Sequence, residues 1–523
     1  MKTEGLLVGR LQSPPLSIWT GLNALFNRRL PSAEACRVFT RAIRRKPRSN
    51  LVRLPNAVHT AVFAPTGVGK GVSIVLPHLL NCPDSCVVVD FKGENYKITA
   101  EHRRRAFRNK IVVLDPFKVV TTTPDTFNPL DCITADNPLA IDDCRDLAEA
   151  LVTRTGQEKE PHWADSAELW IAAMVAVVAQ FGEEDDRSLQ TVRKLLTNPE
   201  KMQAAIKLMC ESTDVWDGML SRLGQQLTQY KDKELGSVLT TTNRFLRFLD
   251  TLAIAASTKA STFDPADLRK GRMTVYLVLP PEHMRAQSAL LRMWIGSMLR
   301  AIVRGGLQEQ HKVHFILDEA ASLGQMDALD DAVDKFRAYG VRLLFLYQSI
   351  GQLKKCWPEG REVTLLSNTT QIYFGVNDLE TAKMVSERLG QSTIVVRSHG
   401  ANAGQSSQSS DDGHASSGRS TGTNENWAQQ GRELLRPDEV MGLSERIAII
   451  FTPGVPPIWT TLLRYYEETF VPPGRWQRLW GGVKMFTGSI LILAVAVMLA
   501  LGASVVANEK AHARQVRIQS FYR

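Results

Sequence analysis

Continuous apolar runs alternate with mixed polar segments along two stretches of the chain. In the first stretch, runs rich in β-branched residues lie at His59–Ala64, Cys86–Asp90 and Ile111–Leu114. In the second, they lie at Met273–Leu279, His314–Leu317, Leu343–Tyr347, Gln371–Gly375 and Ile447–Phe451. Continuously apolar strands that alternate with helices are typical of a parallel sheet covered on both faces. The pattern therefore predicts an α/β fold built around such a sheet.

The period of the pattern changes from strand to helix between these two stretches. From Ile141 to about Ala260 the chain contains amphipathic segments at Ala164–Phe181, Leu189–Leu196, Asp217–Tyr230 and Lys233–Leu249. Apolar residues that recur every three to four positions indicate helices with one buried face. We therefore expect an all-α domain at 141–264, inserted into an α/β domain formed by 58–140 and 265–470.

Residues 398–426 interrupt the second stretch with Ser, Gly, Gln, Asn and Asp. So few apolar side chains cannot bury enough surface to offset the entropy that ordering costs. This composition predicts a flexible surface loop.

A long apolar run lies near the end of the chain. Met485–Ala507 comprises 23 residues without a charge, and at about 1.5 Å per helical residue it covers a bilayer core of about 30 Å. Trp476 and Trp480 precede it, where interfacial indoles are enriched. The run predicts a transmembrane helix at 485–507 followed by a basic tail at 508–523. The alternative is a buried C-terminal helix of a soluble domain.

Composition and charge narrow the class of protein. With 44% hydrophobic and 22% charged residues, the chain is globular rather than disordered. Residues 1–50 hold ten Lys or Arg against Glu4 and Glu34, which predicts a basic arm at 1–57. Such an arm could bind nucleic acid or an anionic membrane surface, and the equally weighted alternative is a solvated leader segment without a partner. The spacing of the seven cysteines shows no disulfide framework and no zinc motif.

The strongest chemical signal is a glycine-rich loop that directly follows the first apolar strand. Its residues are Ala64, Pro65, Thr66, Gly67, Val68, Gly69, Lys70 and Gly71. Backbone N–H groups of such a loop surround the β-phosphate of a nucleotide, while the lysine reaches the β- and γ-oxygens. The usual first glycine is Ala64 here, and the usual hydroxyl that binds Mg²⁺ is Gly71. Thr66 and Ser73 are candidates to replace that hydroxyl.

Polar residues that end two later strands complete a predicted site for a nucleotide and Mg²⁺. Asp318 and Glu319 follow His314–Leu317, and we expect Asp318 to hold the metal and Glu319 to act as general base toward water. Gln348 ends the strand Leu343–Tyr347 and is placed to sense the γ-phosphate. Arg337 lies in the segment between them. It is a candidate to donate hydrogen bonds across a subunit interface to the nucleotide of a neighbouring subunit.

An ordered series of sequence blocks resembles the TraG-type coupling-protein family of type IV secretion and conjugation systems. The blocks run from about residue 58 to 466: APTGVGKG (64–71), VVVDFKGE (87–94), FNPLD (127–131), HWADSA (162–167), LDEAASLG (317–324), RLLFLYQSIGQL (342–353), NTTQIYFGVNDLETA (368–382), SERLG (386–390) and LLRPDEVMGL (434–443). A generic phosphate-loop protein would share only the first and the fifth of these blocks.

The resemblance implies a RecA-like P-loop NTPase domain with an inserted all-α domain, assembled as a homohexameric ring at the cytoplasmic face of the inner membrane. It implies an ATPase that translocates DNA, with relaxase-bound single-stranded DNA or secreted proteins as cargo and secretion-channel components as partners. It also assigns Lys70, Asp318, Glu319, Gln348 and Arg337 the roles given above. An alternative is a nucleotide-dependent receptor for protein cargo that does not pump DNA, and another is a chromosomal DNA pump.

The predicted anchor departs from the family pattern. The family usually carries its transmembrane helices before the nucleotide domain, whereas the apolar run at 485–507 follows that domain in this sequence. Basic residues flank both ends of the run, so charge bias does not orient it. The expected cytoplasmic location of the ATPase gives the orientation instead.

Overall fold

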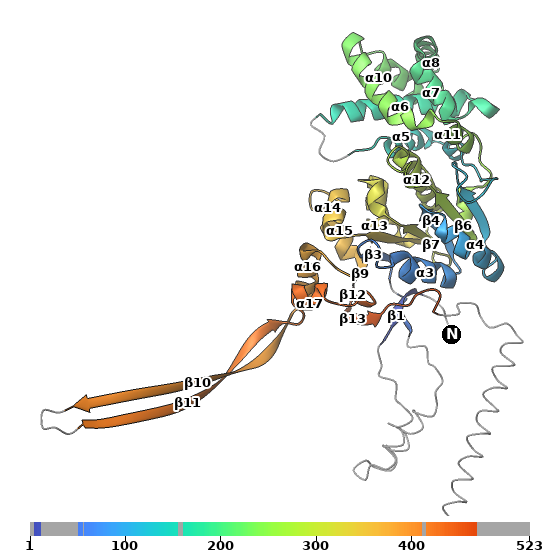
Figure 1. Ribbon diagram of the computed structural model, residues 1–523. Coiled ribbons are helices and arrows are strands. Elements are labelled where there is room, and N and C mark those ends of the chain that lie inside the picture. Colours follow the sequence, from blue (N-terminus) through green and yellow to red (C-terminus); the bar gives the residue numbers. More distant parts are fainter. Residues whose placement is uncertain (1–4, 12–50, 56, 155–159, 410–414, 468–523) are drawn as a thin grey trace, which may run out of the picture. The chain divides into compact units, whose positions relative to one another are not determined.

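The computed structural model describes residues 5–11, 51–55, 57–154, 160–409 and 415–467 (Figure 1). These residues belong to one compact unit, Met1–Glu468, and the second unit, Thr469–Arg523, lies outside the described residues. The predicted transmembrane helix at 485–507, the basic tail and residues 12–50 of the predicted basic arm therefore also lie outside them.

A single 11-stranded sheet forms the centre of the described unit. Its parallel part has the spatial order β5 (Lys110–Leu114), β6 (Met273–Val278), β4 (Ser85–Asp90), β7 (Val313–Leu317), β8 (Val341–Tyr347), β3 (His59–Phe63) and β9 (Thr369–Phe374). Each strand coincides with a predicted apolar run to within two residues. The predicted α/β fold with a parallel sheet is confirmed.

Four antiparallel strands extend the sheet beyond β9. In spatial order they are β12 (Ile447–Thr452), β13 (Val455–Thr461), β1 (Leu6–Arg10) and β2 (Leu51–Leu54). The prediction that all of residues 1–57 form an arm outside the fold is therefore wrong for β1 and β2. Leu6 and Val8 of β1 are buried because they pack into an apolar layer on one face of the sheet, and β1 pairs with β13, whose edge would otherwise expose unpaired backbone groups.

Two apolar layers cover the two faces of the sheet. Successive residues of a strand point to opposite faces, so Val62 of β3 joins one layer while Ala61 and Phe63 join the other. The first layer contains the π-helical turn η1 (Gly71–Val75), α3 (Leu76–Asn81) and α4 (Glu94–Ala106). The second contains α12 (Ser288–Arg304), α13 (Asp327–Asp334), α14 (Ile350–Cys356), α15 (Arg361–Asn368) and α16 (Leu379–Leu389) (Figure 1).

Between β5 and β6 the described residues form helices and turns. The main helices are α5 (Ala140–Leu151), α6 (His162–Phe181), α7 (Leu189–Thr197), α8 (Pro199–Glu211), α9 (Met219–Leu227), α10 (Asp232–Leu246) and α11 (Leu252–Ser257). The four predicted helices are confirmed. Their hydrophobic core is continuous with that of the second layer, because α5 packs against both α6 and α12. A separate domain at 141–264 therefore stays a prediction.

One described helix is long and apolar enough by composition to cross a membrane. This helix is α6, and 72% of its most apolar 18-residue segment is buried inside the protein. Trp170 and most of the residues after it are buried in the helical core. The described structure thus accounts for the apolarity of α6 by packing against its neighbours.

Residues 398–426 differ from their prediction. Those of them that the structure describes, 398–409 and 415–426, lie within two long antiparallel strands, β10 (Gln391–Ser409) and β11 (Ala415–Glu433), which pair from Gln391 with Glu433 to Ser409 with Ala415. The expectation of a loop is wrong because a ladder is held by backbone hydrogen bonds, which polar side chains do not prevent. Composition predicts that no core forms, and it does not exclude strand pairing.

Candidate functional site

The glycine-rich loop Ala64–Gly71 connects β3 to η1 at the carboxyl edge of the sheet. Gly67 and Gly69 have φ angles of +92° and +91°, a region that residues with a Cβ rarely adopt. A Cβ added at Gly71 would meet no atom within 4 Å. The backbone N–H of Ser73 donates to the carbonyl of Gly69 at 3.0 Å. The loop therefore turns directly into a helical turn, as a phosphate-binding loop requires.

Lys70 lies against the beginning of its own loop. Its Nζ donates to the carbonyl oxygens of Ala64 at 2.6 Å and Pro65 at 3.2 Å. Burial lowers the pKa of Lys70, and the nearby Glu319 and Asp318 carboxylates oppose this shift. The lysine and the two acidic residues predicted from different parts of the sequence thus share one electrostatic environment.

The acidic pair follows β7, which is separated from β3 by β8 alone. Burial raises the pKa of Asp318 to about 6, with Glu319 and Asp90 adding to the shift and Lys70 opposing it. Glu319 has φ 56° and ψ 52°, a left-handed conformation that is uncommon for residues other than glycine. Such backbone strain persists only where the surrounding structure enforces it, and it clusters at functional sites.

Two glutamine side chains hold the Glu319 carboxylate. Gln348, at the end of β8, donates from Nε2 to Glu319 Oε1 at 2.9 Å, and Gln352 donates to the same oxygen at 3.0 Å. The Gln348 backbone N–H donates to Gln352 Oε1 at 2.7 Å. Gln352 was missed by sequence reasoning. The available signal was its position four residues after Gln348, in the helix α14 that Ser349 caps.

Arg337 does not join this group within its own chain. It lies exposed in the 3₁₀ turn η7 (Phe336–Tyr339), which precedes β8, whereas Gln348 follows β8. Arg337 therefore lies toward the amino edge of the parallel strands. At that edge, burial lowers the pKa of His59 to about 3, and the positive charges of Arg342 and Arg337 add to this shift. Donation by Arg337 to the nucleotide of a neighbouring subunit stays a prediction.

Arg464 is a second residue that sequence reasoning missed. From the segment after β13, its guanidinium donates to the carbonyl oxygens of Val68 at 3.1 Å and Gly69 at 3.3 Å. The next residue, Tyr465, donates its backbone N–H to the Val72 carbonyl at 3.0 Å. No motif marks an isolated arginine after an antiparallel strand, so only the folded chain shows that this segment supports the glycine-rich loop.

The residues at this edge fit a nucleotide triphosphate and a divalent cation. The loop supplies backbone N–H groups and a lysine for phosphate, and Asp318 supplies a carboxylate oxygen of the type that Mg²⁺ prefers. Ser73 Oγ is buried and has no hydrogen-bond partner within the described part of the chain. Ser73 is therefore a better candidate than the exposed Thr66 to supply the hydroxyl that Gly71 lacks.

Asp318→Asn is expected to separate stability from activity. The pKa of Asp318 is about 6 in the folded chain and 3.8 ordinarily, so its ionised form destabilises the fold above pH 6. In EDTA, the Tm of the variant should exceed that of the unaltered chain at pH 8. This difference should shrink below pH 6 and vanish below about pH 4.

ATP hydrolysis by the same variant should be lost, because the amide is a poorer ligand for Mg²⁺. In the unaltered chain, kcat/KM should fall as the pH drops through about 6. An unchanged Tm at pH 8, or activity that stays flat from pH 5 to 8, would contradict this account of Asp318.

Arg464→Ala is expected to raise the KM for ATP about tenfold with a smaller change in kcat. Hydrogen bonds from a charged donor contribute about 1.5–3 kcal/mol each, and the two that Arg464 makes hold the loop carbonyls. Steady-state kinetics measures the effect. Arg436→Ala is the matched control, because Arg436 forms an exposed pair with Asp438. Equal effects of the two substitutions would remove Arg464 from the site.

Comparison with known proteins adds a family to this geometry. The profile of the family described as "Type IV secretory system Conjugative DNA transfer" matches residues 36–492. Protein VirD4 of Agrobacterium fabrum is 29% identical over 420 residues, which cover 78% of this chain and 59% of that protein. Conjugal transfer protein TraG of Rhizobium radiobacter is 29% identical over 413 residues, 76% and 61% respectively. This chain thus spans about three fifths of the curated relatives it matches.

The solved structures that this fold resembles include the bacterial conjugative coupling protein TrwBdeltaN70. The unbound form has a TM-score of 0.58 at 18% identity, over 80% of this chain and 89% of that one. TrwB in complex with ADP and Mg²⁺ has a TM-score of 0.57 at 17% identity, over 79% and 86%. These likenesses agree on the fold, and the family match covers most of the sequence. The chain therefore belongs to the type IV secretory system conjugative DNA transfer family.

Proposed function

We propose that this protein is the coupling protein of a type IV secretion or conjugation system and that it hydrolyses ATP to move cargo to the secretion channel. One observation carries the proposal. Lys70, Asp318, Glu319 and Gln348 come from three separate sequence blocks and meet at the carboxyl edge of the neighbouring strands β3, β8 and β7. A core without a nucleotide site would have no need for three half-buried charges in this arrangement.

Each residue then has a defined task. The backbone of Ala64–Gly71 binds the β-phosphate, and Lys70 exchanges its two carbonyl partners for phosphate oxygens. Asp318 would hold Mg²⁺, which would supply positive charge to neutralise the β- and γ-phosphates. Glu319 accepts a proton from water, while Gln348 and Gln352 fix the orientation of its carboxylate. These hydrogen bonds leave the second oxygen of Glu319, Oε2, for the water.

Cargo and assembly follow from the family match as further parts of the proposal. DNA would be gripped through its phosphates, largely independently of sequence. The solved TrwB complexes with ADP and Mg²⁺ and with an ATP analogue support the choice of nucleotide. A homohexameric ring would place Arg337 beside a neighbour's nucleotide. The helices between β5 and β6 would form the inserted domain that recognises a relaxase or a secreted protein.

Membrane attachment is the remaining part of the proposal. The uncharged run at 485–507 supports a single span in the inner membrane, with the nucleotide site in the cytoplasm. If the chain is anchored this way, the purified full chain should require detergent to remain dispersed. The functional assays below therefore use the full chain in detergent.

The direct test measures ATP turnover by the purified full chain with and without DNA. We expect single-stranded DNA to stimulate turnover, and stimulation should fall as the salt concentration rises because phosphate contacts are screened. Turnover that is absent under all conditions would remove the ATPase assignment. Turnover that no DNA stimulates, but that a purified relaxase or secreted protein does, would favour a receptor for protein cargo.

A further inference from the structure

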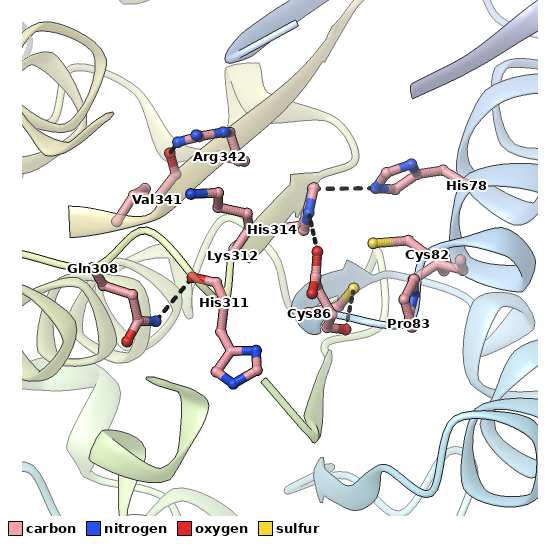
Figure 2. A network of polar contacts seen from close by, with 12 residues as sticks. His78, Cys82, Pro83, Cys86, Gln308, His311, Lys312, His314, Val341 and Arg342 are labelled. Atoms are coloured by element: carbon pink, nitrogen blue, oxygen red, sulfur yellow. Dashed lines mark hydrogen bonds and ion pairs between the residues drawn. The ribbon is translucent and has the colours of Figure 1, made fainter. Parts of the chain in front are cut away.

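A histidine and cysteine cluster lies at the opposite edge of the sheet from the nucleotide site. His78 lies within α3, Cys82 directly follows its last residue, and His314 is the second residue of β7 (Figure 2). One donor atom from each residue lies within 4.8 Å of the other two. His78 and Cys82 are buried. Three side chains of the types that bind transition metals thus converge from segments 236 positions apart.

Local geometry explains why two of these side chains share a face. His78 and Cys82 are four residues apart, and the Cys82 backbone N–H donates to the His78 carbonyl at 2.8 Å. A spacing of four places side chains one above the other on a helix. In Figure 2 the Cys82 sulfur is turned toward the two imidazoles. Cys86 differs, because its thiol donates to the Asp84 carbonyl at 3.6 Å.

The distances match a tetrahedral metal site. His78 Nε2 and His314 Nδ1 are 3.3 Å apart, and two imidazole nitrogens bound to one zinc ion at about 2.05 Å are about 3.3 Å apart. A bound thiolate lies about 3.6 Å from such nitrogens, so a sulfur that lies within 4.8 Å of them needs to approach each by about 1.2 Å at most. Without a metal, the same two nitrogens share a single hydrogen bond.

The surroundings of His314 also suit a metal. Its other nitrogen, Nε2, lies 3.6 Å from Asp84 Oδ2. Imidazole ligands usually direct their second nitrogen to a carboxylate or carbonyl, which fixes the tautomer that binds. A cavity of about 410 Å³ lined by His78, Cys82, Asp84 and His314 reaches this group, and it gives an ion a route of entry. The Cys82 thiolate and the Asp84 carboxylate together balance a divalent charge.

We propose that His78, Cys82 and His314 bind a zinc ion, with Asp84 orienting His314 from outside the coordination sphere. The fourth position faces the cavity and takes water. The site joins α3, the helix that continues the glycine-rich loop, to β7, the strand that ends at Asp318 and Glu319. A bound ion therefore cross-links the helix that follows the phosphate-binding loop to the strand that precedes the acidic pair. This assignment does not depend on ATP hydrolysis.

Metal content and cobalt spectra test the proposal on the full chain, purified without a histidine tag. Mass spectrometry should find about one zinc ion per chain after dialysis against metal-free buffer. Cobalt substitution should give the visible bands of a tetrahedral ion and a near-ultraviolet charge-transfer band from the thiolate. Cys82→Ser should abolish the charge-transfer band, since it removes the sulfur alone. His78→Asn and His314→Gln should each weaken zinc affinity at least about 100-fold in competition with a chelator.

Two controls and one intermediate variant sharpen the result. Asp84→Asn leaves the three ligands in place and should weaken zinc 10- to 100-fold. Cys86→Ser and His311→Gln change nearby residues of the same types and should bind zinc as the unaltered chain does. Circular dichroism checks that each variant is folded. A folded chain that retains no zinc would overturn the proposal, as would a charge-transfer band that persists in Cys82→Ser or zinc bound equally by every variant.

Discussion

Lys70→Ala should reduce ATP turnover on the order of 10²–10³-fold, the usual effect of removing one donor to developing charge. The side chain now bonds to the Ala64 and Pro65 carbonyls, and a nucleotide offers phosphate oxygens in their place. The substitution removes the only lysine of the glycine-rich loop Ala64–Gly71. Steady-state turnover and binding of a fluorescent ATP analogue measure the two consequences separately. Both should be impaired.

The matched control for this variant is Lys97→Ala. Lys97 lies exposed on α4, so the substitution removes the same charge without touching the loop. It should change turnover less than twofold. In cells, Lys70→Ala should also abolish transfer of cargo. Transfer that continues with Lys70→Ala, in a chain confirmed to be folded, would show that hydrolysis is not what this protein contributes.

Glu319→Gln is expected to lower kcat about 10²- to 10⁴-fold, the range for loss of a general base, while leaving the affinity for ATP nearly unchanged. A glutamine at 319 retains an oxygen that can accept from Gln348 and Gln352. It also keeps the size of the side chain and the same backbone conformation. The substitution therefore removes basicity more than geometry, and ATP should accumulate on the variant without being cleaved.

Glu380→Gln serves as the control for Glu319→Gln. Glu380 lies on α16 in an exposed pair with Lys354 at 2.6 Å, and exposed pairs contribute little to stability. ATP turnover by the Glu380→Gln variant should match that of the unaltered chain. If Glu319→Gln hydrolyses ATP at more than a tenth of the normal rate, the base must be another group. A loss of ATP binding in this variant would instead indicate a structural role for Glu319.

The parallel strands of the sheet could be predicted because they are mostly buried on both faces. Such strands are continuously apolar, and this pattern is independent of which strands are neighbours. β3, β7 and β8 were found this way, together with the polar residues that follow them. Because the carboxyl ends of parallel strands share one edge, Lys70, Asp318, Glu319 and Gln348 could be assigned to one site.

Residues that act through long-range contacts were not predictable in this way. Gln352 reaches Glu319 from α14, the helix after Gln348, and Arg464 reaches the carbonyls of Gly69 and Val68 across 395 and 396 positions of sequence. Arg464 belongs to no motif, and the one signal for Gln352 was its position four residues after Gln348. The cluster of His78, Cys82 and His314 has the same origin, since no cysteine or histidine spacing announces it.

The sequence by itself determined the parallel sheet, the helical segments between β5 and β6 and the four residues that meet at the carboxyl edge, because all of these depend on local periodicity and strand ends. Only the tertiary structure decided that β1 and β2 close the antiparallel edge, that residues 398–409 pair with 415–426, and that Arg337 lies away from the site of its own chain. Strand pairing is a backbone interaction between segments distant in sequence. Side-chain composition therefore constrains it only weakly, and the folded chain has to show which partners meet.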